Sequence, residues 1–191
     1  VVTANEGDDR EYDAWEDYTK AKKLKTLSPE LKQALANQDS KSLRVFKDMG
    51  MNSNGQYDSL YMAGTRSFSI WDAQGHLIFD SGAQFEQTLA RVLPQQFNNR
   101  VDDDDNGFFF EGIDARSLKK GAEPEALAIA QIGQRHFAYI GLEKQGGIFV
   151  YDITNPYGPQ QVQYFNDIDY SKKPEQAGDL EPEGMVHFQQ D

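Results

Sequence analysis

The chain has 191 residues, of which 31 are Asp or Glu and 19 are Lys or Arg, so its formal net charge is −12 at pH 7. An acidic surface repels phosphate backbones, which argues against nucleic acid as a partner and favours cations such as calcium, whose ligands are carboxylate and carbonyl oxygens. The absence of cysteine excludes thiolate catalysis, thiolate metal sites and disulfides. No apolar run reaches the roughly 18 residues that a membrane-spanning helix needs.

Residues 1–4 are prone to form a strand, whereas residues 11–50 are of mixed acidic, aromatic and apolar character. The sequence predicts the start of a helix within residues 11–50. Ser28 is the expected N-cap, Pro29 the first helical residue, and Glu30 lies in the first turn. We therefore expect a largely helical insertion at 11–50.

A β-pattern begins at residue 57. Residues 67–72 alternate between polar and apolar side chains, a turn follows, and residues 76–80 return as a second strand, which predicts a hairpin. A short helix is expected within 83–93. Residues 98–121, with the acidic run at 102–105, are expected to form a loop.

The clearest block begins at residue 123. Four apolar segments, separated by turns rich in Gly, Asn and Pro, predict strands at 126–132, 136–142, 147–152 and 161–165. Four short antiparallel strands in about 45 residues have the size of one propeller blade. The predicted fold class is therefore mainly β, with blade-like four-stranded antiparallel sheets.

An internal repeat supports this interpretation. Glu123-Pro124-Glu125-Ala126 recurs 58 residues later as Glu181-Pro182-Glu183-Gly184, and each copy precedes an apolar strand start. On this pattern the chain begins in the second strand of one blade, contains a complete blade, and reaches the first strand of a third. A propeller needs at least about four blades. We therefore expect residues 1–191 to be a fragment of a β-propeller, about two blades, or else a β assembly built from similar hairpins.

Seven motifs in order resemble those of the choice-of-anchor I family: TANEGD (3–8), GTRSFSIWD (64–72), FDSG (79–82), GAEPE (121–125), GLE (141–143), GGIFVYD (146–152) and GDLEPEG (178–184). The resemblance implies a bacterial, extracytoplasmic protein that is periplasmic, secreted or held at the cell surface. It also implies a β-propeller similar to a mesenchyme-specific cell-surface glycoprotein, in a family whose members often carry an alkaline-phosphatase label.

The candidate metal ligands are four acidic residues. First strands line the central channel of a propeller, so Glu125 and Glu183, at equivalent blade entrances, are expected to converge. Converging carboxylates are costly unless they are paired or bound to a cation, for which calcium is suited. Glu6 and Asp8, which follow a strand end, are further candidate ligands. The alternatives are that each glutamate accepts backbone N–H bonds at a turn fixed by proline, and that Glu6 and Asp8 lie in a solvated acidic turn.

Other candidate sites have weaker patterns. Arg66 is the best single cation for a substrate phosphate or carboxylate, although a cross-strand ion pair is the interpretation we favour. Residues 102–107 match the start of a calcium loop, but Ile113 stands where a bidentate Glu is needed, so a solvated charge run is expected. The histidines lack zinc-site spacing, and no nucleophile elbow or phosphate-cradling glycine loop occurs.

Two functional hypotheses follow. The first is a secreted or cell-surface binding or adhesion domain that binds calcium and an unknown extracellular ligand. The second is a calcium-dependent phosphoesterase, a phosphoric monoester hydrolase of alkaline-phosphatase or phytase type, acting on a phosphoester. The open blade ends also predict self-association of this chain as a two-fold dimer, unless its two terminal strands pair with each other.

Overall fold

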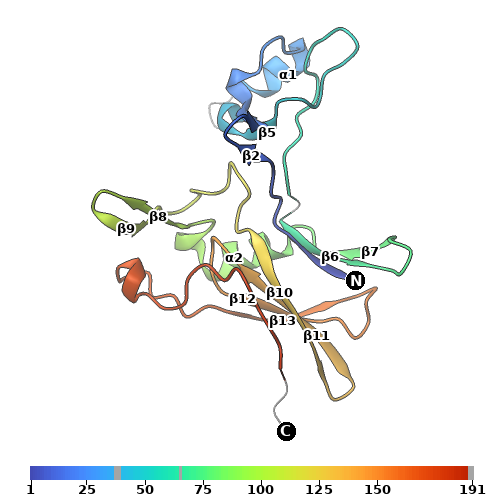
Figure 1. The fold of residues 1–191 in the computed structure, drawn as a ribbon, viewed down its shortest axis with the longest axis vertical. Coiled ribbons are helices and arrows are strands. Elements are labelled where there is room, and N and C mark those ends of the chain that lie inside the picture. Colours follow the sequence, from blue (N-terminus) through green and yellow to red (C-terminus); the bar gives the residue numbers. More distant parts are fainter. Residues whose placement is uncertain (37–39, 65, 189–191) are drawn as a thin grey trace. The chain divides into compact units, whose positions relative to one another are not determined.

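The computed structural model describes residues 1–36, 40–64 and 66–188, and this part of the chain is mainly β with a few short helices (Figure 1). The chain divides into two compact units. The first comprises Val1–Glu6, Thr65–Ser117 and Gly121–Asp191, and the second comprises Gly7–Gly64 with Leu118–Lys120. No helix among the described residues has the length and apolar character required to cross a membrane.

The largest sheet of the first unit is an antiparallel meander with strand order β10-β11-β12-β13. Its strands are β10 (Pro124–Ile132), β11 (Arg135–Leu142), β12 (Ile148–Asp152) and β13 (Gln160–Phe165). All four predicted strands are confirmed. Ile132 pairs with Arg135 across a two-residue turn in which Gly133 has a φ of 63°, a conformation that glycine adopts without steric cost.

The second sheet of this unit has the order β1-β6-β7, with β1 (Val2–Asn5), β6 (Ser67–Trp71) and β7 (Leu77–Asp80). The predicted hairpin at 67–80 and the predicted strand at 1–4 are both present. Asn5 pairs with Ser67, and its side-chain amide donates hydrogen bonds to Ser67 Oγ (3.0 Å) and Ser69 Oγ (2.7 Å). These bonds fix the end of β1, from which Glu6 projects.

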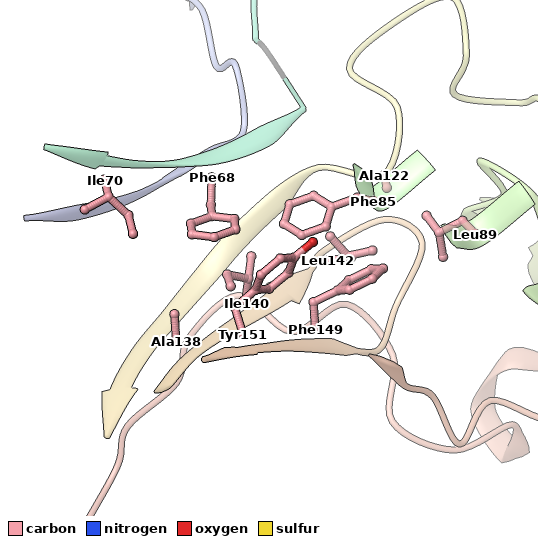
Figure 2. Packing of buried hydrophobic residues seen from close by; sticks show 10 residues of the cluster. All are labelled: Phe68, Ile70, Phe85, Leu89, Ala122, Ala138, Ile140, Leu142, Phe149 and Tyr151. Atoms are coloured by element: carbon pink, nitrogen blue, oxygen red, sulfur yellow. The ribbon is translucent and has the colours of Figure 1, made fainter. Parts of the chain in front are cut away.

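The main hydrophobic core lies between the two sheets and helix α2 (Gln84–Val92) (Figure 2). The helix that we expected within 83–93 is confirmed, and it places Phe85 and Leu89 on one buried face. Phe85 packs against Phe149 of β12 with ring centroids 4.6 Å apart, and Phe68 of β6 packs against Tyr151 at 4.7 Å. Burying a side chain of this size stabilises the fold by about 1.5–3 kcal/mol.

The segment between α2 and β10 differs from the expectation. Residues 98–121 were expected to form a loop, but β8 (Val101–Asp104) and β9 (Gly107–Phe110) form a hairpin, which follows the 3-10 helix η3 (Pro94–Gln96). Asp104 Oδ1 accepts a hydrogen bond of 2.8 Å from the Asn106 amide in its turn. Acidic side chains are rare in strands, but Arg100 forms ion pairs with Asp102 and Glu111 and so offsets their charge.

Between β13 and residue 188 the chain forms one 3-10 helix, η4 (Pro174–Gln176). The first strand of a third blade, which the repeat predicted after the second Glu-Pro-Glu turn, is absent: residues 177–188 have no regular secondary structure. The structure pairs β1 with β6 only, so the two terminal segments do not pair with each other within the described residues.

The second unit has its own small core and mixed secondary structure. It contains β2 (Glu11–Tyr12), β3 (Trp15–Glu16), β4 (Tyr18–Lys20), η1 (Ala21–Lys23), α1 (Pro29–Ala34), η2 (Ser40–Ser42) and β5 (Arg44–Phe46). The predicted helix start is correct, because Ser28 Oγ accepts a hydrogen bond from the Leu31 amide at 3.1 Å. The expectation of a largely helical segment at 11–50 is not met. The helices there are short, and Tyr18 and Val45 are instead buried by the pairing of β4 with β5.

Candidate functional site

Three glutamates from separate parts of the first unit converge. Glu6 follows β1, Glu125 is the second residue of β10, and Glu143 follows β11. One carboxylate oxygen of each lies within 4.8 Å of those of the other two. The antiparallel register places Pro124 opposite Leu142, and the side chains of Glu125 and Glu143 are close enough to form a hydrogen bond. Strand β1 contacts β10. Glu143 is 9% exposed, whereas Glu6 and Glu125 are partly exposed.

The two Glu-Pro-Glu turns share an unusual backbone conformation. Glu123 and Glu181 both lie in the left-handed region, with φ of 56° and 49°. A non-glycine residue adopts this conformation at a cost in free energy, which the surrounding contacts must offset. At the first turn, Glu123 accepts a 2.7 Å hydrogen bond from the Glu143 amide. This bond ties the start of β10 to the end of β11, and it helps to hold Glu125 beside Glu143.

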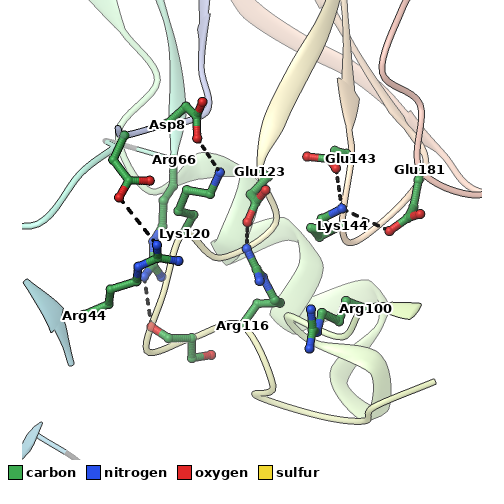
Figure 3. Close-up of polar contacts among 12 residues, drawn as sticks. Asp8, Arg44, Arg66, Arg100, Arg116, Lys120, Glu123, Glu143, Lys144 and Glu181 are labelled. Atoms are coloured by element: carbon green, nitrogen blue, oxygen red, sulfur yellow. Dashed lines mark hydrogen bonds and ion pairs between the residues drawn. The ribbon is translucent and has the colours of Figure 1, made fainter. Parts of the chain in front are cut away.

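The side chains of Glu123 and Glu181 each also have a cationic partner (Figure 3). The carboxylate of Glu123, a buried residue, forms an ion pair with the buried Arg116. Lys144 Nζ contacts both Glu143 Oε1 and, at 3.2 Å, Glu181 Oε1. The repeat seen in the sequence thus corresponds to two structurally similar turns, each with a positive charge beside its first glutamate.

Proximity of the carboxylates alters their protonation. Burial, together with a hydrogen bond to Glu143 and the negative charges of Glu143, Glu6 and Glu183, raises the pKa of Glu125 to about 7. Burial alone would lower the pKa of Lys144, but hydrogen bonds and charges from Glu143 and Glu181 outweigh it, so that this pKa is raised. At neutral pH the group therefore contains a partly protonated carboxyl and one ammonium group among several carboxylates.

The group has the chemistry of a site for a hard divalent cation. Calcium binds six to eight oxygen ligands at 2.3–2.6 Å, so two oxygens on opposite sides of one ion are roughly 5 Å apart. The 4.8 Å spread of the three carboxylate oxygens fits within that span. Glu6, Glu125 and Glu143 together offer six oxygen atoms, and the partial exposure of two of them leaves access for water ligands.

Of the four predicted metal ligands, two belong to the group of three glutamates and two do not. Glu6 and Glu125 are brought together. Glu183 is exposed and outside the close group, although its charge contributes to the raised pKa of Glu125. Asp8 belongs to the second unit, where its Oδ1 lies 3.4 Å from Lys120 Nζ.

Glu143 was not among the predicted ligands. The signal that could have revealed it is its place directly after a strand, in Leu142-Glu143, which matches the place of Glu6 in Asn5-Glu6.

Arg66, the predicted anion ligand, is held within the first unit. Its Nη1 lies 2.8 Å from Glu86 Oε1 of α2, and its Nη2 donates a 2.9 Å hydrogen bond to the Ser117 carbonyl. The ion pair that we favoured on sequence therefore exists, but it joins Arg66 to a helix and not to a neighbouring strand.

Comparison with known proteins identifies the family. The model of the choice-of-anchor I domain matches residues 1–156, a range that includes all three converging glutamates. The chain belongs to the choice-of-anchor I family. This membership, which the motifs predicted, indicates a secreted or cell-surface protein.

A curated relative matches part of this chain. Gigasin-3a from Magallana gigas is 33% identical over 114 residues, which is 59% of this chain and 39% of that protein. The aligned region therefore spans well under half of the relative's length. No solved structure matches the chain significantly.

Proposed function

We propose that this chain is a secreted or cell-surface binding domain of β-propeller type, in which Glu6, Glu125 and Glu143 hold a calcium ion. The observation that carries the proposal is the convergence of three carboxylates within 4.8 Å. Like charges at such distances destabilise the fold unless a proton or a cation neutralises them. A bound calcium ion would replace the proton that Glu125 holds and would fasten β1, β10 and β11 together.

The packing of the first unit supports the propeller interpretation. The β10–β13 meander has the order of a blade, and the β1-β6-β7 sheet packs against it face to face through the main core. On this interpretation β1 is a second strand, β10 is the innermost strand of the complete blade, and the turn at Glu181 enters the next blade. The carboxylates then lie where the innermost strand begins and the second strands of neighbouring blades end, as expected for a ligand site near the central channel.

A calcium-dependent phosphoesterase is the alternative function. In that case the ion would polarise a phosphoryl oxygen, and a cationic side chain would hold the phosphate. The candidate for the second role, Arg66, forms an ion pair with Glu86. The binding function is therefore the one proposed, and the calcium ion has a structural role in it.

Calorimetric titration tests the calcium site. Protein stripped with a chelator and dialysed is titrated with calcium at pH 8, beside Glu125→Gln and the control Glu30→Gln, an exposed carboxylate in the first turn of α1. Wild type and the control are expected to bind one ion with equal affinity, and Glu125→Gln to bind at least about tenfold more weakly, equivalent to ~1.4 kcal/mol. Equal binding by all three proteins, or no binding by wild type, would overturn the proposal.

Two further measurements complete the test. Binding to the folded state alone stabilises it by about 2.7 kcal/mol at a calcium concentration 100 times Kd, so the melting temperature of wild type should rise with calcium. A phosphomonoester assay then separates the two functions. Turnover that is lost with chelator and in Glu125→Gln would establish the phosphoesterase, and absence of turnover across pH with calcium supports the binding domain.

A further inference from the structure

Residues 20–32 of the second unit form a basic segment in a chain that is otherwise acidic. The sequence of this segment is KAKKLKTLSPELK, and its only carboxylate is Glu30. The five lysines are Lys20, Lys22, Lys23, Lys25 and Lys32. The whole chain, by contrast, has a formal net charge of −12. The segment is therefore a local positive region, which attracts anions although the molecule as a whole repels them.

The backbone of this segment turns its lysines towards solvent. The 3-10 helix η1 has three residues per turn, and the residues on either side of it, Lys20 (φ −74°, ψ 137°) and Leu24 (φ −64°, ψ 134°), have the polyproline II conformation, which also has three residues per turn. A period of three puts Ala21 and Leu24 on one side, and both pack with Leu27 in the core of the second unit. The side chains left on the solvent side are exposed, those of Lys20, Lys22, Lys23, Lys25 and Thr26.

Hydrogen bonds hold the backbone of the segment in place. The Ala21 amide donates to the Leu43 carbonyl (2.9 Å), and the Tyr57 amide donates to the Thr26 carbonyl (3.0 Å). Lys32 is exposed on α1, directly after the buried Leu31. The lysines are thus presented from an ordered backbone, so a ligand that binds them does not have to order a flexible tail.

The fold itself does not use the charges of the five lysines. None of the five forms an ion pair or a side-chain hydrogen bond with any residue that the structure describes. Other cations of the chain are paired, for example Arg10 with Asp17 and Arg100 with Asp102. Because like charges so close in the chain repel one another, an anion that spans several of them is bound favourably.

We propose that the five lysines bind a linear anionic polysaccharide, whose sulfate or carboxylate groups contact the lysine ammonium groups. Short lysine-rich stretches of this length are typical of heparin-binding patches. The family is secreted or held at the cell surface, where anionic glycans are the linear polyanions at hand. A thin chain can contact the five lysines and avoid the acidic remainder of the protein, whose repulsion is screened beyond about 8 Å.

A lipid membrane fits this segment less well. Binding in the membrane interface needs apolar side chains that insert among the lipids, in addition to basic charge. The leucines of the segment, Leu24, Leu27 and Leu31, instead pack in the core of the second unit. A flat anionic surface would also face acidic parts of the protein, which a thin polysaccharide does not.

Calorimetric titration with heparin at about 50 mM salt tests the proposal. The protein is kept in chelator, so the result does not depend on the calcium site. Wild type is expected to bind, and Lys22→Gln/Lys25→Gln to bind at least about tenfold more weakly, because each lysine lost forfeits the release of one counterion. The control Lys172→Gln/Lys173→Gln removes the same charge from an exposed lysine pair of the first unit and should bind within about twofold of wild type.

Salt dependence supplies a second measurement. For flexible polyanions the logarithm of the binding constant falls with the logarithm of salt concentration by about 0.7 per neutralised charge. The slope of Lys22→Gln/Lys25→Gln should therefore be smaller than that of wild type by about 1.4, whereas the control should keep the wild-type slope. Equal melting temperatures would show that both variants fold, as expected for exposed side chains.

Other probes identify the anionic group. Chondroitin sulfate carries sulfates, whereas hyaluronate carries carboxylates alone. Binding of heparin and chondroitin sulfate without hyaluronate would support the proposal and assign the contact to sulfate. Binding of all three would support it and show that carboxylates suffice.

Four results would overturn the proposal. The first is no binding of heparin by wild type. The second is equal binding by wild type and Lys22→Gln/Lys25→Gln. The third is an equal loss in the control, which would assign the effect to net charge. The fourth is tighter binding of phosphatidylserine vesicles or duplex DNA than of heparin.

The proposal names a ligand for the binding domain proposed above and in that sense rests on that function. The two can still fail separately. Calcium binding without heparin binding would overturn the polysaccharide site alone, and heparin binding without calcium binding would overturn the calcium site alone.

Discussion

The first prediction concerns the hydrophobic core and tests Phe149, the second residue of β12. Its side chain is fully buried, with ring centroids 4.6 Å from Phe85 of α2 and 4.5 Å from Tyr164 of β13. It also lies opposite Ile140 in β11, the strand that ends beside Glu143. Phe149→Ala therefore removes a contact shared by a helix and two strands of the sheet that positions the carboxylates.

Truncation of a buried phenylalanine to alanine costs about 3–5 kcal/mol, since the cavity adds to the lost transfer free energy. Domains are stable by about 5–15 kcal/mol, so this loss is a large fraction of the total. With a urea m-value of about 2 kcal/mol/M, a loss of about 3 kcal/mol lowers the unfolding midpoint by about 1.5 M. Fluorescence of Trp71 in β6 reports on this unit, and a Trp15→Phe background removes the other tryptophan.

Val150→Ala is the matched control. Val150 is the next residue of β12, so its side chain points to the opposite face of the sheet, where it is half-buried. Val150→Ala should lower the free energy of unfolding by about 1 kcal/mol or less. A loss below about 1 kcal/mol for Phe149→Ala, with a large loss for Val150→Ala, would show that the register is shifted by one residue and would refute the packing described here.

Three further predictions concern charge. Because the folded state raises the pKa of Glu125 from 4.5 to about 7, protonation stabilises the metal-free fold at low pH. This stabilisation is lost as pH rises through 7, so the melting temperature should fall between pH 5 and 8 more in wild type than in Glu125→Gln; equal slopes would contradict it. Lys144→Gln removes the ammonium beside Glu143 and should tighten calcium binding in calorimetry, whereas weaker binding would show that Lys144 supports the site. Arg116→Met leaves the buried Glu123 without its ion pair and should cost about 3–5 kcal/mol in urea unfolding, and a loss under about 1 kcal/mol would contradict the pairing.

The meander could be predicted from sequence because its information is local. Continuous apolar runs in β11 and β12 and a glycine turn after β10 indicate strands without knowledge of the rest of the chain. The pairing of β1 with β6 depends on a contact between residues more than 60 positions apart, which no local pattern reveals. The β8–β9 hairpin was missed because its acidic residues resemble a solvated loop until Arg100 is placed between them.

Two of the three glutamates of the candidate site could be predicted from the sequence. Glu125 was found because the Glu-Pro-Glu turn recurs, and Glu6 because it follows a strand. Glu143 joins them through the register of β10 with β11, which shifts between Pro124 and Leu127 and cannot be read from either strand alone. The partner of Arg66 likewise depends on where α2 packs.

The central claim is that Glu6, Glu125 and Glu143 bind one calcium ion, and a crystal structure of the chain grown with calcium tests it most directly. The account predicts an anomalous peak with carboxylate oxygens of all three glutamates at 2.3–2.6 Å. Water alone between these carboxylates, with calcium bound instead at the acidic β8–β9 hairpin or at Asp8, would contradict it.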